Sequence, residues 1–162
     1  MALSDVSNIL WRERQLLDLL VFKLEEEQLV LAAGRTRWLS HATREVENVL
    51  AEIKRVELER AMSVADAGRE LGLSGSLTLK ELSGLTPAPW DGIFAEHRRA
   101  LLALAQEIDG VAKSNRDMLT RGQLATREAL ASLGEIELDV YTPRGAAQAD
   151  RSAALRLIDE AM

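Results

Sequence analysis

Apolar residues recur at spacings of three and four residues along three long stretches of the chain. The middle stretch is the most regular, with six apolar residues at alternating spacings: Leu39, Ala42, Val46, Val49, Ile53 and Val56. In the first stretch four leucines fall every seven residues: Leu10, Leu17, Leu24 and Leu31. Alternation of three and four is the a/d pattern of helices that pack side by side. We therefore predict long helices over about residues 4–33 and 35–70.

The third stretch carries two columns of seam residues. One column is Phe94, Leu101, Ile108 and Asn115, and the other is His97, Leu104, Val111 and Met118. The pattern predicts a helix over about residues 89–133. It continues through Gly122, Ala125 and Ala129, and small side chains bury little apolar surface. We expect the far end of this helix to be looser than the rest, or packed more closely on a neighbour.

Two segments break the helical pattern. Between the second and third stretches, "GLSGSLTLKELSGLTPAPW" contains three glycines, three serines and two prolines, which predict a loop of about fifteen residues that allows one helical turn at residues 79–82. After Gly134, "EIELDVYTPRG" and "AAQAD" indicate extended chain and a linker. The final "RSAALRLIDEAM" has Leu155, Ile158 and Met162 at helical spacing, with Leu157 beside them.

The last segment predicts a short amphipathic helix over about residues 152–161. A helix this short is not stable alone in water. It therefore folds back as a cap on the other helices, or stays without structure, or acts as a recognition element that folds when it binds a partner. The residues leave all three open, and the third explains best why a short apolar-edged helix follows a linker.

The predicted fold is all-α. Residues 1–135 form an antiparallel bundle or coiled coil of three long helices, and residues 136–162 form a flexible C-terminal tail that ends in the short amphipathic helix. The composition agrees, since 47% of the residues are hydrophobic but only 4% are aromatic, which suits helix packing better than a sheet sandwich.

Charge and residue content exclude several classes of function. The formal net charge of −6 and the pI of about 5.1 disfavour nucleic acid and anionic membrane surfaces as partners. No cysteine is present, and no stretch is apolar enough for membrane insertion, so we expect a cytoplasmic protein. His41 and His97 have no partner at metal-ligand spacing, and no catalytic motif occurs. We predict no enzyme activity, no metal and no cofactor.

Asn115 and the three tryptophans have two interpretations each. A polar residue on the seam fixes the register between helices, or it marks an open groove that receives a partner. Trp11, Trp38 and Trp90 lie near segment ends, where tryptophans cap a core or anchor an interface.

Several short motifs occur in a recognisable order along the chain. A leucine-rich first helix is followed by "VELERA" near the end of the second, then by "GL" and "TLKEL" in the connector. The third helix carries "NRDML", and "YTPRG" and "RLIDEAM" follow. In this order the motifs resemble those of the FlgN family. Two features depart from the family pattern: Ala112 stands where a second asparagine is common, and "LGEIELD" is more polar than expected before Tyr141.

The resemblance implies a flagellar type III export chaperone without ATPase activity. Its clients would be the hook–filament junction proteins, which it would keep from premature assembly and bring to the export gate. Carried over to this sequence, Leu155, Leu157, Ile158 and Met162 would belong to client capture, and Tyr141 would contact the gate. The residues also leave open a self-associating structural coiled-coil scaffold, such as a homo-dimer, for which the tail would be unnecessary.

Overall fold

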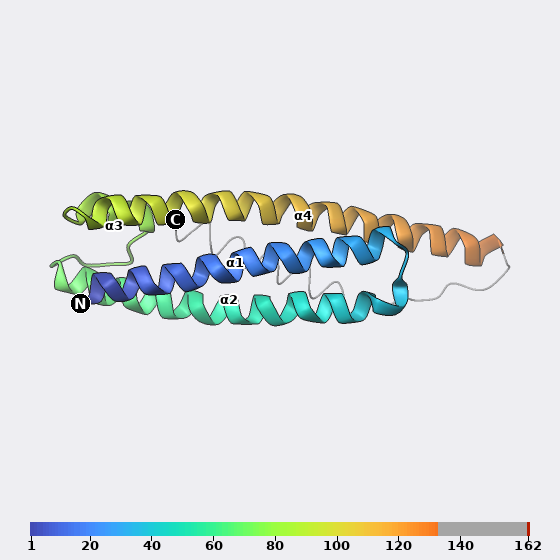
Figure 1. Cartoon of the computed structure of the whole chain (residues 1–162), viewed down its shortest axis with the longest axis horizontal. Helices are drawn as coiled ribbons and strands as arrows, with labels where there is room; N and C mark the ends of the chain where they lie inside the picture. Colours follow the sequence, from blue (N-terminus) through green and yellow to red (C-terminus); the bar gives the residue numbers. More distant parts are fainter. Residues whose placement is uncertain (133–161) are drawn as a thin grey trace.

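The computed structural model describes residues 1–132 and residue 162. The described residues form four helices: α1 (Ala2–Ala32), α2 (Thr36–Glu70), α3 (Leu79–Leu85) and α4 (Trp90–Ser132). Within this part of the chain there is no strand, which confirms the all-α prediction. α1 packs against both α2 and α4, and the short α3 packs against α4 (Figure 1). α2 runs antiparallel to α1, whereas α4 runs parallel to α1 (Figure 1).

The predicted seam residues of α1 and α2 form the core. All six seam residues of α2 are buried, and three of the four regularly spaced leucines of α1, Leu10, Leu17 and Leu24, have no exposed surface. Burial of one such side chain contributes about 1.5–3 kcal/mol. The alternating spacing therefore identified the packed faces of these two helices correctly.

In α4 the buried face shifts along the helix. Phe94, Leu101 and Ile108 are buried as predicted, but in the second column only His97 is buried, and burial then passes to Ala105 and Ala112. An α-helix has about 3.6 residues per turn, so a seven-residue column drifts by about 20° per heptad around a straight helix. In the second column, burial therefore moves from Leu104 and Val111 to the residues directly after them, Ala105 and Ala112.

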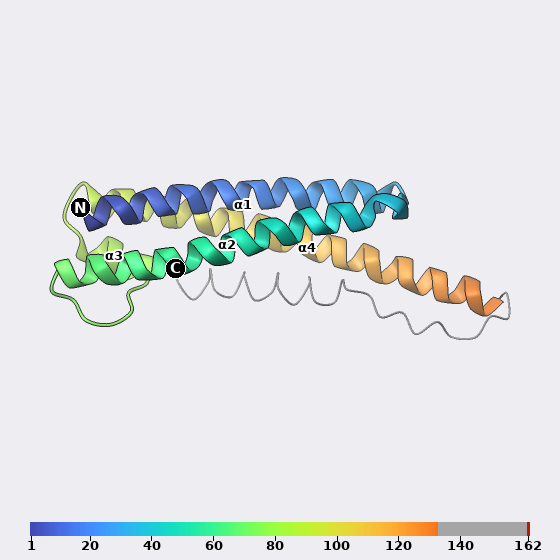
Figure 2. The same ribbon diagram turned by 90° about the horizontal axis from the view of Figure 1, so that it is seen from below.

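The far end of α4 extends past the turn between α1 and α2 (Figures 1 and 2). Beyond Asn115 the helix has no buried residue, and Leu124 is among the exposed side chains. Residues 116–132 span roughly 25 Å at about 1.5 Å per residue. This agrees with the looser far end that Gly122, Ala125 and Ala129 predict.

The connector contains a longer helix than the single turn expected from the sequence. Thr78 Oγ1 accepts a hydrogen bond from the Glu81 amide at 3.2 Å, and Glu81 Oε2 accepts one from the Thr78 amide at 2.8 Å. This reciprocal capping box starts α3, which extends to Leu85 and buries Leu79 and Leu82. The sequence contains the signal, a threonine followed three residues later by a glutamate.

A buried polar layer joins the three long helices near the end of the core. Asn115 Nδ2 donates to Leu24 O at 2.9 Å and to Glu27 Oε1 at 3.1 Å. Thr43 Oγ1 donates to Glu27 Oε2 at 3.2 Å. The Glu27 carboxylate of α1 therefore accepts hydrogen bonds from both α2 and α4. Because a shift of either helix would break these bonds, the layer supports the register role of Asn115.

Replacing Asn115 with alanine should lower the free energy of unfolding by about 1–3 kcal/mol, because two bonds to α1 are lost and a buried acceptor on Glu27 loses a donor. Urea denaturation would measure the change. Asn48→Ala is the matched control, since Asn48 is exposed on α2 and should cost little. Equal effects at the two positions would contradict a structural role for the layer.

Candidate partner-binding site

Of the five residues that the sequence assigns to partner binding, the structure describes Met162. The other four, Tyr141, Leu155, Leu157 and Ile158, lie outside the described residues, as do the predicted tail and its short helix. Met162 is buried, with 7% of its surface exposed. It lies beside α4, at the end of the chain marked C (Figure 1).

Met162 is held by polar contacts with α3 and α4. Its carbonyl oxygen accepts a hydrogen bond from Arg98 Nε at 3.0 Å and one from the Lys80 amide at 3.3 Å. Lys80 lies in the first turn of α3, where amides have no partner within the helix and are free to bind other acceptors. We call Lys80, Arg98 and the apolar surface beside them the Met162 site.

The apolar part of the Met162 site is continuous with the core. The side chain of Met162 belongs to the same hydrophobic cluster as Leu79 and Leu82 of α3 and Phe94 of α4. Trp90 stacks on Phe94 with 5.7 Å between ring centroids and packs against the cluster. The site can therefore bind one apolar side chain together with one carbonyl oxygen of the same segment.

Met162 contacts α3 and α4 of its own chain, and the sequence alone could not predict this position. Arg98 is 64 residues earlier in the sequence, and no pattern in either segment links them. Lys80 and Arg98 were not predicted as site residues.

Two of the three tryptophans are exposed, so they do not cap the core. Trp11 is 50% exposed and Trp38 is 47% exposed, whereas Trp90 is partly buried. The Arg14 guanidinium lies 4.1 Å from the Trp11 ring centroid, a cation–π contact that orients the indole. Exposed tryptophans are common anchors of protein interfaces.

His97 is buried between α1 and α4, as its seam position predicts. Arg14 Nη1 lies 3.4 Å from Nδ1, and Ser7 Oγ lies 3.2 Å from Nε2. Because arginine can only donate, Nδ1 accepts and Nε2 carries the hydrogen that is donated to Ser7. Burial lowers the pKa of His97, and the Arg14 charge adds to the decrease. The imidazole is therefore a neutral packing group with two fixed partners.

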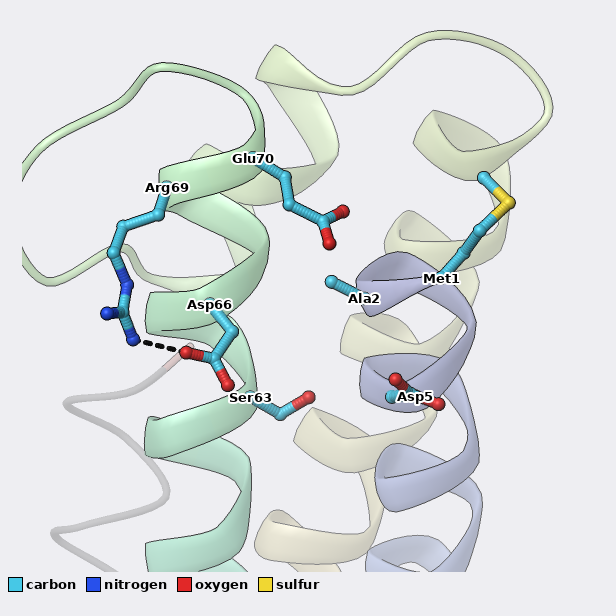
Figure 3. Close-up of a pocket in the computed structure, with 7 residues that line it drawn as sticks. All are labelled: Met1, Ala2, Asp5, Ser63, Asp66, Arg69 and Glu70. Atoms are coloured by element: carbon cyan, nitrogen blue, oxygen red, sulfur yellow. Dashed lines mark hydrogen bonds and ion pairs between the residues drawn. The ribbon is translucent and has the colours of Figure 1, made fainter.

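A shallow cavity lies between the start of α1 and the end of α2 (Figure 3). Its volume is about 480 Å³, and it is lined by Met1, Ala2, Asp5, Ser63, Asp66, Arg69 and Glu70. Arg69 pairs with Asp66, and Glu70 of α2 points toward the space between the two helices. Over residues 1–132 and 162, no group of three histidine, aspartate or glutamate side chains is placed to hold a metal ion.

Over the described residues, long helices packed along apolar seams define an all-helical fold. Among its described helices, none combines the length and the apolar character needed to cross a membrane. The family model described as "FlgN protein" matches residues 1–149, and the chain belongs to the FlgN family. Membership implies a general role as a flagellar export chaperone, in a family not known for enzymatic activity. No curated protein and no solved structure shows a significant match to the chain.

Proposed function

We propose that the protein is a cytoplasmic chaperone that binds hook–filament junction proteins, prevents their premature assembly and delivers them to the flagellar export gate. The observation that carries the proposal is the family match across residues 1–149. That match includes Tyr141 and ends before Leu155. Within the proposal, Tyr141 contacts the gate, and Leu155, Leu157, Ile158 and Met162 bind the client.

A chaperone that covers a filament protein and later releases it has physical requirements that the predicted division meets. That division is a helical bundle, residues 1–135, and a tail, residues 136–162. Proteins that polymerise into a filament expose apolar helical surface, which drives self-association unless it is covered. A short helix that becomes ordered on binding loses part of its interaction energy to ordering, so affinity stays moderate and release needs no ATP. Attachment to the bundle raises its effective concentration and restores efficient capture.

A chain that ends at Asp139 should bind the junction protein of the same genome at least tenfold more weakly than the full chain, a loss of about 1.4 kcal/mol. The reason is that the four proposed client-binding residues are absent from it. Titration calorimetry would measure both affinities and the stoichiometry, which we expect to be one to one.

Tyr141→Ala is the matched control for this truncation, because it changes the proposed gate contact and should leave client affinity unchanged. Client binding that survives the truncation would move the capture site to the bundle. Binding by neither form would refute the client assignment.

A self-associating scaffold is the second candidate, and the exposed apolar side chains favour it. Phe22, Leu29 and Trp38 are 58%, 72% and 47% exposed. Burial of such residues against a second copy would stabilise a homo-dimer. Sedimentation analysis of the full chain separates the two candidates, because a scaffold remains oligomeric at micromolar concentration and a chaperone with a one-to-one client complex need not.

A further inference from the structure

Met162 has one set of contacts in the structure and a different one in the proposed function. Its carbonyl oxygen accepts hydrogen bonds from Arg98 of α4 and from the Lys80 amide of α3, and its side chain belongs to the hydrophobic core cluster. The proposed function assigns the same residue to the client. With 7% of its surface exposed, Met162 cannot contact a client in this arrangement. The two contacts are mutually exclusive.

We propose that the Met162 site on α3 and α4 regulates client capture: Met162 occupies the site in the free protein, and a client binds only when Met162 leaves it. The inference rests on the proposed function and adds a competing intramolecular contact to it. The client must then supply an apolar surface that binds Met162 more strongly than α3 and α4 do.

The polar contacts of the Met162 site are strong enough to hold the residue and weak enough to be exchanged. The bond from Arg98 is charge-assisted, which makes it stronger than a neutral hydrogen bond. Lys80 is exposed and Arg98 is only partly buried. When Met162 leaves, water can therefore reach both donors, and neither remains as an unsatisfied buried group.

The apolar contact is also suited to exchange. A methionine side chain is unbranched and polarisable, so it packs into surfaces of different shape. Its transfer from the Met162 site to an apolar client surface buries the side chain in both states. The net cost of the transfer is then small, whereas opening without a client exposes the side chain, so the site is mostly closed in the free protein and the apparent client affinity is reduced by the fraction of molecules in which the site is open.

The first test concerns the free protein. Arg98→Ala removes the side-chain donor from a partly buried position on α4 while preserving helix propensity. Loss of this bond should raise the hydrogen-exchange rate of the Lys80 amide at least about threefold, because that amide is protected by the same carbonyl oxygen. Arg99→Ala is the charge-matched control, since Arg99 is its exposed neighbour and should leave the rate unchanged.

The second test adds the client. Arg98→Ala should bind the junction protein about three to ten times more tightly than the unchanged chain, because the open state is more populated. Arg99→Ala should bind with unchanged affinity. Unchanged or weaker binding by Arg98→Ala would overturn the competition, and weaker binding would identify Arg98 as a client contact. Failure of every form to bind would overturn the proposed function as well, whereas an unchanged Lys80 exchange rate with client binding intact would overturn the competition alone.

Discussion

Replacing Arg60 with alanine should lower the free energy of unfolding by about 3–5 kcal/mol, because two buried carboxyl groups lose the donor that satisfies them. Arg60 of α2 lies between two carboxyl groups. Its Nη1 donates to both oxygens of Glu13 at 3.0 and 2.9 Å, and its Nη2 donates to Glu57 Oε2 at 3.1 Å. The side chains of Glu13, Arg60 and Glu57 are 0%, 5% and 9% exposed. Water therefore cannot replace the guanidinium, and urea denaturation should show the full loss.

Arg55→Ala is the control for this substitution. Arg55 lies on the same helix and pairs with Glu52, but the two side chains are 64% and 42% exposed. An exposed pair of this kind contributes at most about 1 kcal/mol. If the two substitutions cost the same, the buried cluster of Glu13, Arg60 and Glu57 does not hold α1 against α2.

Much of the core could be predicted from the sequence, because apolar spacing reports which face of a helix is buried. Leu10, Leu17 and Leu24 illustrate this in α1, and Val46 and Ile53 do so in α2. The same spacing failed for Leu104 and Val111, which are only partly buried, since a heptad count ignores the drift of a straight helix.

The buried cluster of Glu13, Arg60 and Glu57 was not predicted. Glu13 lies three residues after Leu10 and four before Leu17, so its place on the leucine face is visible in the sequence. Its partner Arg60 is 47 residues away, and only the antiparallel register of α1 and α2 brings the two together. A glutamate in a sequence is usually expected to face solvent, so sequence patterns do not predict a buried pair of this kind.

The binding role of the last segment stays a prediction. A short apolar segment after a linker predicts that the segment packs on some surface, because a helix of that length is not stable alone. Local patterns could not show which surface. The position of Met162 against Arg98 and Lys80 depends on how α3 packs on α4, which is a tertiary contact.

The stability of the protein should fall as pH rises from 7 to 9, because Glu13 holds a proton in the folded state. Burial raises the pKa of Glu13 to about 9, the neighbouring Glu57 carboxyl adds to the rise, and Arg60 opposes it. The unfolded chain has the ordinary pKa of 4.5. A raised folded-state pKa stabilises fully below the unfolded value, and this stabilisation is lost as pH rises through the folded value.

The range from pH 7 to 9 isolates this effect from His97. The pKa of His97 is lowered in the folded state, so its contribution is lost only as pH falls below its ordinary value of 6.5. Above pH 7 the imidazole is neutral in both states. One group can produce a slope of at most about 1.4 kcal/mol per pH unit, and urea denaturation at several pH values would measure it.

Glu13→Gln should keep the stability at pH 7 within about 1 kcal/mol of the original and abolish most of the slope, because an amide is neutral at every pH in this range. Its oxygen can still accept from Arg60, and its NH₂ group can donate to Glu57 Oε1, a buried oxygen for which the described part of the chain shows no donor. Glu59→Gln is the control, since Glu59 is partly exposed and pairs with Arg12 outside the cluster. A slope that persists in Glu13→Gln, or disappears in Glu59→Gln, would show that the proton is held elsewhere.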